Sequence, residues 1–241
     1  MSRINSQRKG CKDVFNAFLV KSATYAGDYE FPRIIASYDI PNKLISFSKA
    51  TALKDTNQWV HFYEDDYLFE RIWKNPEKYL DILKKYNGVI LPDFSLYRDM
   101  PLCMQIWNIY RSRAIGHWLQ TNGIKVIPNI RYGDYRTYYI CCDGIEKHCT
   151  IAVGTHGNLK LIPDREVFLS GLDAIVETLE PKTIVVYGAA PDKFLRSIRR
   201  LESTLFSLIV ATLPHIRRWC RWAQDIMADL EQQKVSLRVV R

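Results

Sequence analysis

Short apolar runs alternate with helical patterns between residues 40 and 190 of the chain. This alternation is typical of βα units around a mostly parallel sheet. The apolar runs contain few polar residues, as strands covered on both faces do. We therefore predict strands at 43–48, 59–63, 88–92, 125–130, 149–154 and 183–188.

The helices between these strands have recognisable ends. One begins near Asn75 and stops before Gly88, and a second covers about 100–120. A third begins at Asp164, a good N-cap residue, and is stopped by Pro181.

One segment interrupts the alternation, because Asp143-Gly144 lies between two strand-like arms and favours a hairpin turn. The pattern as a whole predicts an α/β fold. We expect a (βα) barrel-like arrangement of six to seven mostly parallel strands with one inserted β-hairpin. An open doubly wound sheet is the alternative.

The positive charge is concentrated at the ends of the 241-residue chain. The formal net charge is +8, and residues 193–241 contain ten Lys or Arg against four acids, which leaves the body nearly neutral. We expect a basic N-terminal arm (1–30), an α/β domain (31–193) and a basic, Trp- and Arg-rich tail (194–241). The tail is predicted to be helical and loosely packed. Any contact with nucleic acid would use these ends only.

Two further features indicate the compartment. No apolar run approaches the roughly 18 residues of a membrane span, and the start lacks the apolar core of a secretory signal. The six cysteines include no C-x-x-C pair. Reduced thiols in a cytoplasmic protein are the simplest interpretation.

Polar residues lie at the carboxyl end of each predicted strand. Because ligands of parallel α/β folds bind outside the carboxyl ends of the strands, we expect these residues to share one rim. They are Ser48, Lys49, Glu64, Asp65, Asp66, Asp93, Asn129, Arg131, Thr155, His156 and Tyr187.

The acids of this rim suggest a reaction. Glu64, Asp65 and Asp93 are the candidate catalytic residues, and Asp65 and Asp93 could hold Mg²⁺ or Mn²⁺. Lys49 or Arg131 would then bind a phosphate oxygen. The alternative is structural: Asp65 or Asp66 caps the following helix, and Asp93 caps a turn.

Other polar groups carry weaker signals. Gly154-Thr155-His156-Gly157 can cradle a phosphate or form an ordinary turn. The spacing of Cys141, Cys142, His148 and Cys149 matches no zinc pattern. His61 is expected to be a core histidine.

On the helix at 100–120, Gln105, Asn108, Arg111 and Ser112 form a polar stripe, for which exposure to solvent is the default expectation. Arg111 is expected to pair with a carboxylate, Asp93 or Asp99.

Four motifs resemble a known family: DFSLYRDMPL, Q-x-x-N-x-Y-R-S-R, G-x-x-VIPNIR and IAVGT. The resemblance covers about residues 31–193 and is to domain of unknown function 4417, found in bacteria, phages and mobile elements. It implies no established activity. It does imply that its recurrent polar residues form a site: Asp93, Asp99, Gln105, Asn108, Arg111, Asn129 and Arg131. Lys49 and Thr155 complete the predicted ligand-binding set.

The tail departs from this family. Codons for RSIRRLESTLFSLIV exist that, read from the third base of Arg196, encode KYKALGINFIQFDS. That reading contains a helix end, a Gly stop and a strand ending in Asp-Ser, much as VILPDFS does. A shifted reading frame near Phe194 is therefore our hypothesis for residues 195–241.

Two classes of function follow from these patterns. The first is a mobile-element enzyme that performs metal-assisted hydrolysis or transfer on a phosphate-bearing or nucleotide-like substrate. The second is a non-catalytic module that binds a ligand or partner at the rim.

Overall fold

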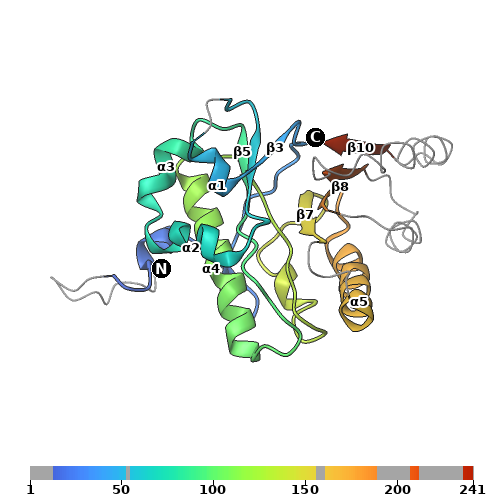
Figure 1. Cartoon of the computed structure of the whole chain (residues 1–241). Coiled ribbons are helices and arrows are strands. Elements are labelled where there is room, and N and C mark those ends of the chain that lie inside the picture. Colours follow the sequence, from blue (N-terminus) through green and yellow to red (C-terminus); the bar gives the residue numbers. More distant parts are fainter. Residues whose placement is uncertain (1–12, 53–54, 156–160, 189–206, 212–235, 241) are drawn as a thin grey trace.

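Parallel strands form the centre of the computed structural model, which describes residues 13–52, 55–155, 161–188, 207–211 and 236–240 (Figure 1). The parallel strands are β3 (Leu44–Ser46), β4 (Trp59–His61), β5 (Gly88–Ile90), β6 (Val126–Ile127), β7 (Thr150–Gly154), β8 (Thr183–Tyr187), β9 (Ser207–Ala211) and β10 (Ser236–Val240). All six strands predicted from the apolar runs are present as β3 to β8, each shorter than its run.

Five α-helices and two 3-10 turns surround these strands in the described part of the chain. The helices are α1 (Phe47–Ala50), α2 (Asp66–Lys74), α3 (Glu77–Leu83), α4 (Leu102–Thr121) and α5 (Ile162–Leu179), and the 3-10 turns are η1 (Ala17–Val20) and η2 (Ile140–Cys142). Two short antiparallel strands, β1 (Tyr25–Ala26) and β2 (Phe31–Pro32), precede the sheet. Helix α5 begins half a turn before the predicted start at Asp164.

The strands follow one another in chain order. One parallel sheet has the order β3-β4-β5-β6, and a second has the order β7-β8 followed by β9 and β10. A parallel bridge between Asn129 and Ala152 joins the two sheets. No sheet closes into a barrel among the described residues, and their strand order shows no reversal of the kind that defines a doubly wound sheet. The fold shown is therefore mixed α/β with parallel four-stranded sheets.

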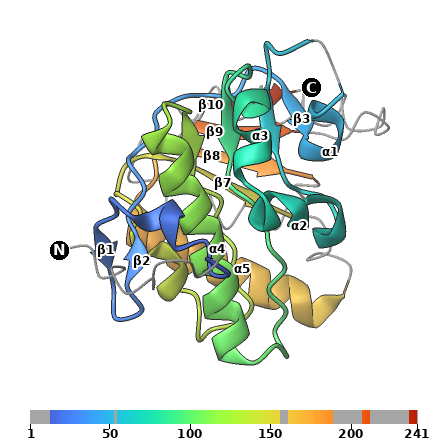
Figure 2. The same ribbon diagram turned by 90° about the vertical axis from the view of Figure 1, so that its left-hand side faces the viewer.

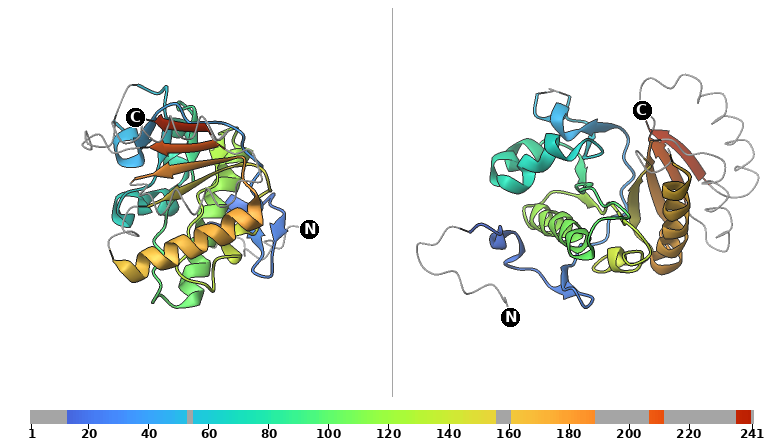
Figure 3. Two further views of the ribbon diagram at one scale, coloured as in Figure 1. Left: turned by 90° about the vertical axis from the view of Figure 1, so that its right-hand side faces the viewer. Right: turned by 60° about the horizontal axis from the view of Figure 1, so that its bottom comes forward.

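Alternate residues of each strand face different cores. In β4 and its extension, Val60 and Phe62 pack under the helices, whereas Trp59 and Tyr63 join an inner cluster with Ile90 and other strand residues. Figure 2 shows α4 between the β1–β2 pair and helices α2 and α3. Helix α5 covers the face of β7 and β8 that points away from the inner cluster (Figure 3). Burial on both faces explains the near-continuous apolar runs.

The predicted hairpin is wrong. Residues 140–142 form η2, and Gly144 is in a turn with φ 78°. The apolar side chains of the expected arms, Cys141 and Cys142 among them, are buried beside α5 and do not pair as strands. The Asp-Gly turn was identified correctly, but packing against a helix replaced strand pairing.

The tail also differs from expectation where it is described. Residues 207–211 and 236–240 are strands, and β9 pairs in parallel with β8 along its whole length. The expectation of helix is therefore wrong for these ten residues. The rest of the tail, with Trp219 and Trp222, lies outside the described residues, as do residues 1–12 of the basic arm.

Candidate functional site

Four side chains from three strand ends form a connected group at the rim. Asp93 lies three residues beyond β5, and its Oδ1 accepts a hydrogen bond of 2.8 Å from Nδ2 of Asn129. The Oδ1 of Asn129 in turn accepts one of 2.9 Å from the hydroxyl of Tyr63. Arg131 Nη1 lies 3.6 Å from Asp93 Oδ2, and the two side chains are 14% and 13% exposed. We call these four residues the rim group. Their assembly confirms that Asp93, Asn129 and Arg131 meet at one end of the sheet.

The rim group continues inward as a stack of rings. The rings of Tyr63 and Tyr187 stack with their centroids 4.7 Å apart, and the ring centroid of His61 lies 4.4 Å from that of Tyr187. Burial, followed by the Asp93 carboxylate, raises the pKa of Tyr63 well above its usual value, so the phenol keeps its proton. Burial lowers the pKa of His61 to about 3, with a further contribution from Lys49. Tyr63 N donates to His61 Nδ1 at 3.1 Å, so the neutral ring carries its proton on Nε2. As expected, His61 is a core histidine.

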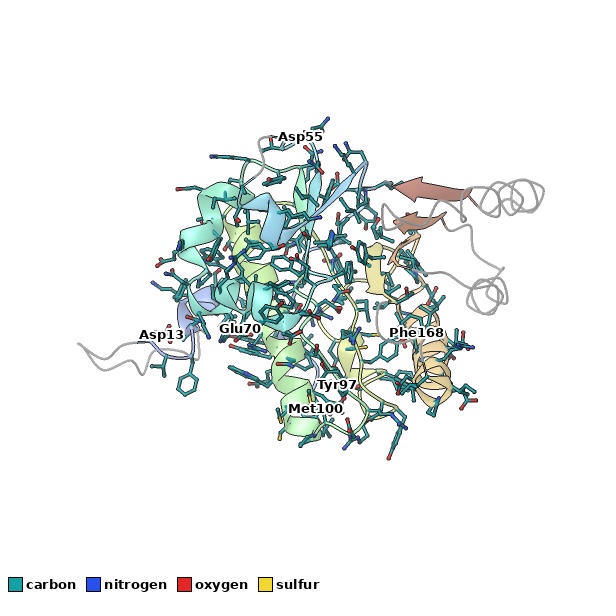
Figure 4. All side chains as sticks on the ribbon, viewed as in Figure 1. Asp13, Asp55, Glu70, Tyr97, Met100 and Phe168 are labelled. Atoms are coloured by element: carbon teal, nitrogen blue, oxygen red, sulfur yellow. The ribbon has the colours of Figure 1, made fainter. Side chains whose placement is uncertain are left out.

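A cavity of about 330 Å³ opens beside the rim group. Its walls come from the loops after β5 and β6, the end of β7 and the first turns of α5. Figure 4 labels Tyr97, on the loop after β5, and Phe168, on α5, and both residues line this space. An ion pair of 3.1 Å between Arg98 Nε and Asp164 joins the loop to α5. The lining residues are Leu96, Tyr97, Arg98, Asp99, Ile130, Arg131, Tyr132, Gly133, Gly154, Asp164, Val167 and Phe168.

The cavity is lined by both apolar and charged residues. Leu96, Ile130, Val167 and Phe168 supply aliphatic and aromatic surface, whereas Arg98, Asp99, Arg131 and Asp164 supply charge. A volume near 300 Å³ is at the small end of ligand pockets. The cavity is thus large enough for a small ligand, and its lining contains both hydrogen-bond donors and acceptors.

The polar stripe of α4 is buried and not exposed to solvent, so the default expectation was wrong. Gln105, Asn108, Arg111 and Ser112 are at most 9% exposed. Three of them bind loop groups, and Arg111 binds α2. Asn108 Nδ2 donates to Ser95 O at 2.7 Å, and Ser112 Oγ donates to Pro92 O at 2.9 Å. These residues hold the segment around Asp93 in place.

Arg111 pairs with a carboxylate, as predicted, but with neither expected partner. Its Nη1 donates to both oxygens of Glu70 on α2, at 2.7 and 2.9 Å, and its Nη2 donates to Asn108 Oδ1. The guanidinium also lies 3.9 Å from the centroid of the Phe94 ring. Arg111 therefore ties α4 to α2 beneath the rim.

Gln105 belongs to a second network, on the loop after β6. Its Nε2 donates to Met100 O at 2.9 Å and to Asp134 Oδ2 at 3.1 Å, and its Oε1 accepts from Thr137 at 3.2 Å. Hydrogen bonds from Arg136 hold the pKa of Asp134 at about 2, with help from Gln105. The network fixes the loop that carries Arg131 to Gly133.

Two of the remaining acids, Glu64 and Asp66, have partners other than Asp93. Glu64 accepts hydrogen bonds from the backbone N and the hydroxyl of Ser48. Asp66 accepts from the backbone N and hydroxyl of Ser95, at 3.1 and 2.8 Å. Asp65 is the N-cap residue of α2, without a side-chain capping bond. The structure therefore does not gather the predicted acids into one cluster.

Among the residues that the structure describes, no three His, Cys, Asp or Glu side chains are arranged to hold a metal ion. This holds for the rim acids and for Cys141, Cys142, His148 and Cys149. Burial raises the pKa of the thiols of Cys141 and Cys149, which keeps them protonated. A Mg²⁺ or Mn²⁺ ion at Asp65 or Asp93 stays a prediction.

Two other predicted ligand residues have structural contacts. Thr155 is buried, and its N–H and hydroxyl bind Tyr187 O at 3.0 and 3.3 Å, which joins the ends of β7 and β8. Lys49 is on the four-residue α1, close enough to His61 to affect its pKa. His156 and Gly157 of the predicted phosphate loop lie outside the described residues.

Several residues of the site were missed in the sequence. Tyr63 was assigned only to a strand, and Glu70, Arg113 and Asp134 were not singled out. Arg113 could have been identified from the sequence, because it lies in the motif Q-x-x-N-x-Y-R-S-R with the other buried polar residues of α4. The others could be identified only once the packing of α2 and of the β6 loop was known.

Comparison with known proteins places the chain in a family. The family model described as "Domain of unknown function (DUF4417)" matches residues 23–202. The Gene 1 protein of Mycobacterium phage L5 is 34% identical over 187 residues, covering 76% of this chain and 80% of the phage protein. The Gene 1 protein of Mycobacterium phage D29 is 31% identical over 186 residues, with 76% and 68% covered. No solved structure matches.

No helix in the described part of the chain is both long and apolar enough to cross a membrane. The four motifs that carry the resemblance lie in strands β6 and β7, in helix α4 and in the loops of the rim site, and both relatives are phage proteins. The chain belongs to the family of domain of unknown function 4417.

Proposed function

We propose that this chain binds a small phosphate-bearing, nucleotide-like ligand in the 330 Å³ cavity, with Arg131 as the group that contacts its anionic end. One observation carries the proposal. Arg131 lies in the cavity wall, and its Nη1 is 3.6 Å from Asp93, within ion-pair range but beyond a normal hydrogen bond. The terminal N–H groups of Arg131 are thus oriented by Asp93 without being saturated by it, and a ligand oxygen can take them.

The rest of the cavity suits the other end of such a ligand. Its apolar lining residues, Leu96, Val167 and Phe168 among them, would contact a flat ring. Arg98 and Asp99 in the same lining offer a donor and an acceptor for sugar or base groups. A chain-ordered parallel sheet would place this cavity at the carboxyl rim of a barrel-like fold, which is where ligands of such folds bind.

Binding is tested by calorimetric titration with a panel of nucleotides, nucleosides and inorganic phosphate. Arg131→Gln removes the proposed anion contact and should weaken nucleotide binding about 10- to 100-fold, since a charge-assisted hydrogen bond contributes about 1.5–3 kcal/mol. Lys125→Gln is the matched control, because it removes one positive charge from an exposed ion pair with Asp39, outside the cavity. An equal loss of nucleotide affinity in the two variants would mean that only the long-range effect of charge contributes. It would refute a direct contact between Arg131 and the ligand.

A metal-assisted reaction on the same ligand is the second candidate, and Asp93 favours it. Its carboxylate borders Gly154 of the cavity wall, where the position of a Cβ would be 3.4 Å from Asp93 Oδ2. Asp93 would be the acid that binds Mg²⁺ or Mn²⁺, with Glu64 or Asp65 requiring movement to join it. Phosphate release that depends on Mg²⁺ or Mn²⁺ and is lost in Asp93→Asn would establish the enzyme. Tight nucleotide binding without turnover would establish the binding module.

A further inference from the structure

Two adjacent cysteines, Cys141 and Cys142, lie in the 3-10 turn η2. In the strand arm expected from the sequence, adjacent side chains would point to opposite faces. The turn instead brings both thiols to the carbonyl oxygen of Tyr138, to which their Sγ atoms donate at 3.2 and 3.6 Å. The two sulfur atoms therefore share one acceptor.

The two thiols also contact each other. Burial, followed by a hydrogen bond with the Cys142 side chain, raises the pKa of the Cys141 thiol well above its usual value. Both residues are free cysteines, and Cys141 is 0% and Cys142 4% exposed. A buried, protonated thiol reacts slowly, so the pair stays reduced until an oxidant is present for a long time. Cys142 retains some exposed surface, and a small oxidant reaches it first.

Arg113 connects this pair to the rim group. The arginine is 1% exposed, its Nη2 donates to Cys141 O at 2.6 Å, and its Nη1 donates to Asn129 O at 3.3 Å. No carboxylate in the described part of the chain lies within ion-pair distance of its guanidinium. A buried guanidinium depends on its hydrogen-bond acceptors. A change in the backbone at Cys141 therefore acts, through Arg113, on the loop after β6.

A disulfide between adjacent residues would change that backbone. Disulfides favour Cα atoms about 4.4–6.8 Å apart, whereas consecutive Cα atoms are about 3.8 Å apart across a trans peptide. Closing the ring therefore strains and turns the peptide between residues 141 and 142. The oxygen that Arg113 binds belongs to this peptide. Strain also makes a disulfide easier to reduce, so the change is reversible.

We propose that Cys141 and Cys142 form a peroxide-sensitive switch, in which a disulfide between them withdraws Cys141 O from Arg113 and loosens the loop that carries Asn129 and Arg131. Cys142 Sγ attacks one oxygen of hydrogen peroxide, the O–O bond breaks, and the departing hydroxide takes the thiol proton. Cys141 Sγ then attacks the sulfur of this sulfenic acid, the S–O bond breaks, and a second water leaves. The thiol pair is oxidised and the peroxide is reduced to water. The switch does not depend on what the 330 Å³ cavity binds.

Peptide mapping tests the chemistry. The full chain is treated with hydrogen peroxide under native conditions, its remaining thiols are alkylated after denaturation, and it is digested with trypsin. Residues 137–147 form one tryptic peptide, which contains Cys141, Cys142 and no other cysteine. We expect this peptide to escape alkylation and to lose its two thiol hydrogens.

Two controls make the mapping decisive. Exposed Cys103, in the tryptic peptide 99–111, reports that the oxidant has acted. Cys149→Ser removes a buried thiol outside the pair, and the same disulfide should form in this variant. Cys141 and Cys142 that are still alkylated when Cys103 is fully oxidised overturn the proposal. A disulfide from either of them to Cys149 overturns it as well.

Hydrogen exchange followed by mass spectrometry tests the coupling to the rim. Ile130 N donates to Ala152 O at 2.8 Å, so its amide is protected while the loop is in place. In the oxidised chain, exchange at residues 129–131 should be faster, and dithiothreitol should restore the original rate. Peroxide-treated Cys142→Ser cannot close the ring and should keep that rate. A disulfide that forms without changing exchange at 129–131 would show that the pair does not act on the rim, and the switch would be refuted.

Discussion

At the scale of single residues, the rim depends on a glycine. A Cβ at position 154 would lie 2.7 Å from two ring carbons of the buried Tyr63, so Gly154→Ala forces the ring to move. Overpacking of this kind should lower the free energy of unfolding by about 1–3 kcal/mol, measured by urea denaturation. Adding Tyr63→Leu removes the ring, and the double variant should lose less than the sum of the two single losses. Strict additivity would show that the clash is not the cause.

His61 predicts a dependence of stability on pH. Its folded pKa of about 3 is below the usual 6.5 because the ring is buried, so the unfolded chain binds the proton more readily. The contribution of neutral His61 to the free energy of unfolding is therefore fully present above pH 6.5. It is lost as pH falls toward 3, by roughly 1 kcal/mol per pH unit. Urea denaturation at pH 7 and pH 5 should show a steeper loss in the wild type than in His61→Phe. Equal slopes in the two proteins would contradict the buried neutral state.

At the scale of elements, Arg111 joins two helices. It is mostly buried between α4 and α2, with Glu70 as its partner and the Phe94 ring beneath it. Arg111→Ala should lower stability by about 1–3 kcal/mol, because it leaves the Glu70 carboxylate without its cation. The double variant Arg111→Ala with Glu70→Ala should lose less stability than the sum of the losses in the two single variants. A change within about 0.5 kcal/mol for Arg111→Ala would mean that the pair behaves as a surface contact.

Element type was predictable where both faces of an element are buried, as in β7, whose five residues are all buried apolar or small ones. Sequence patterning failed where packing decided the outcome. The segment at 140–142 has strand-like residues but packs against α5, and the polar stripe of α4 meets loops and helix α2, not water. Polar residues at helical spacing look the same whether a loop or solvent covers them, so Gln105 and Asn108 could not be assigned from spacing alone.

At the scale of the whole molecule, the rim was predictable because parallel strands present their carboxyl ends on one side. This placed Asp93, Asn129 and Arg131 together correctly. It could not say which strand ends are close enough to touch, since that depends on sheet curvature and on local partners. Glu64 follows β4 just as Tyr63 does, yet it turns to Ser48 while Tyr63 reaches Asn129. A shared rim is thus a weaker prediction than a shared site.

The reading frame of the tail can be tested at this scale. The family model ends at residue 202, and β8 pairs with a strand at 207–211. The shifted reading KYKALGINFIQFDS would also supply an apolar strand here, INFIQF, encoded by codons 202–208. Either frame therefore covers the edge of β8, an edge that would otherwise favour aggregation. After this strand, the shifted reading continues with Asp-Ser. This ending resembles Asp93-Phe94-Ser95, which follows β5.

If the frame is shifted, the coding DNA should contain the KYKALGINFIQFDS reading downstream of Phe194. Restoring that frame should then raise Tm and reduce aggregation on heating relative to the present chain, because a strand with a polar end would continue the rim. Intrinsic fluorescence during a thermal ramp measures Tm, and light scattering during the same ramp measures aggregation. A coding sequence whose other frames lack this reading would refute the hypothesis. A restored chain that aggregates more readily than the present one would refute it as well.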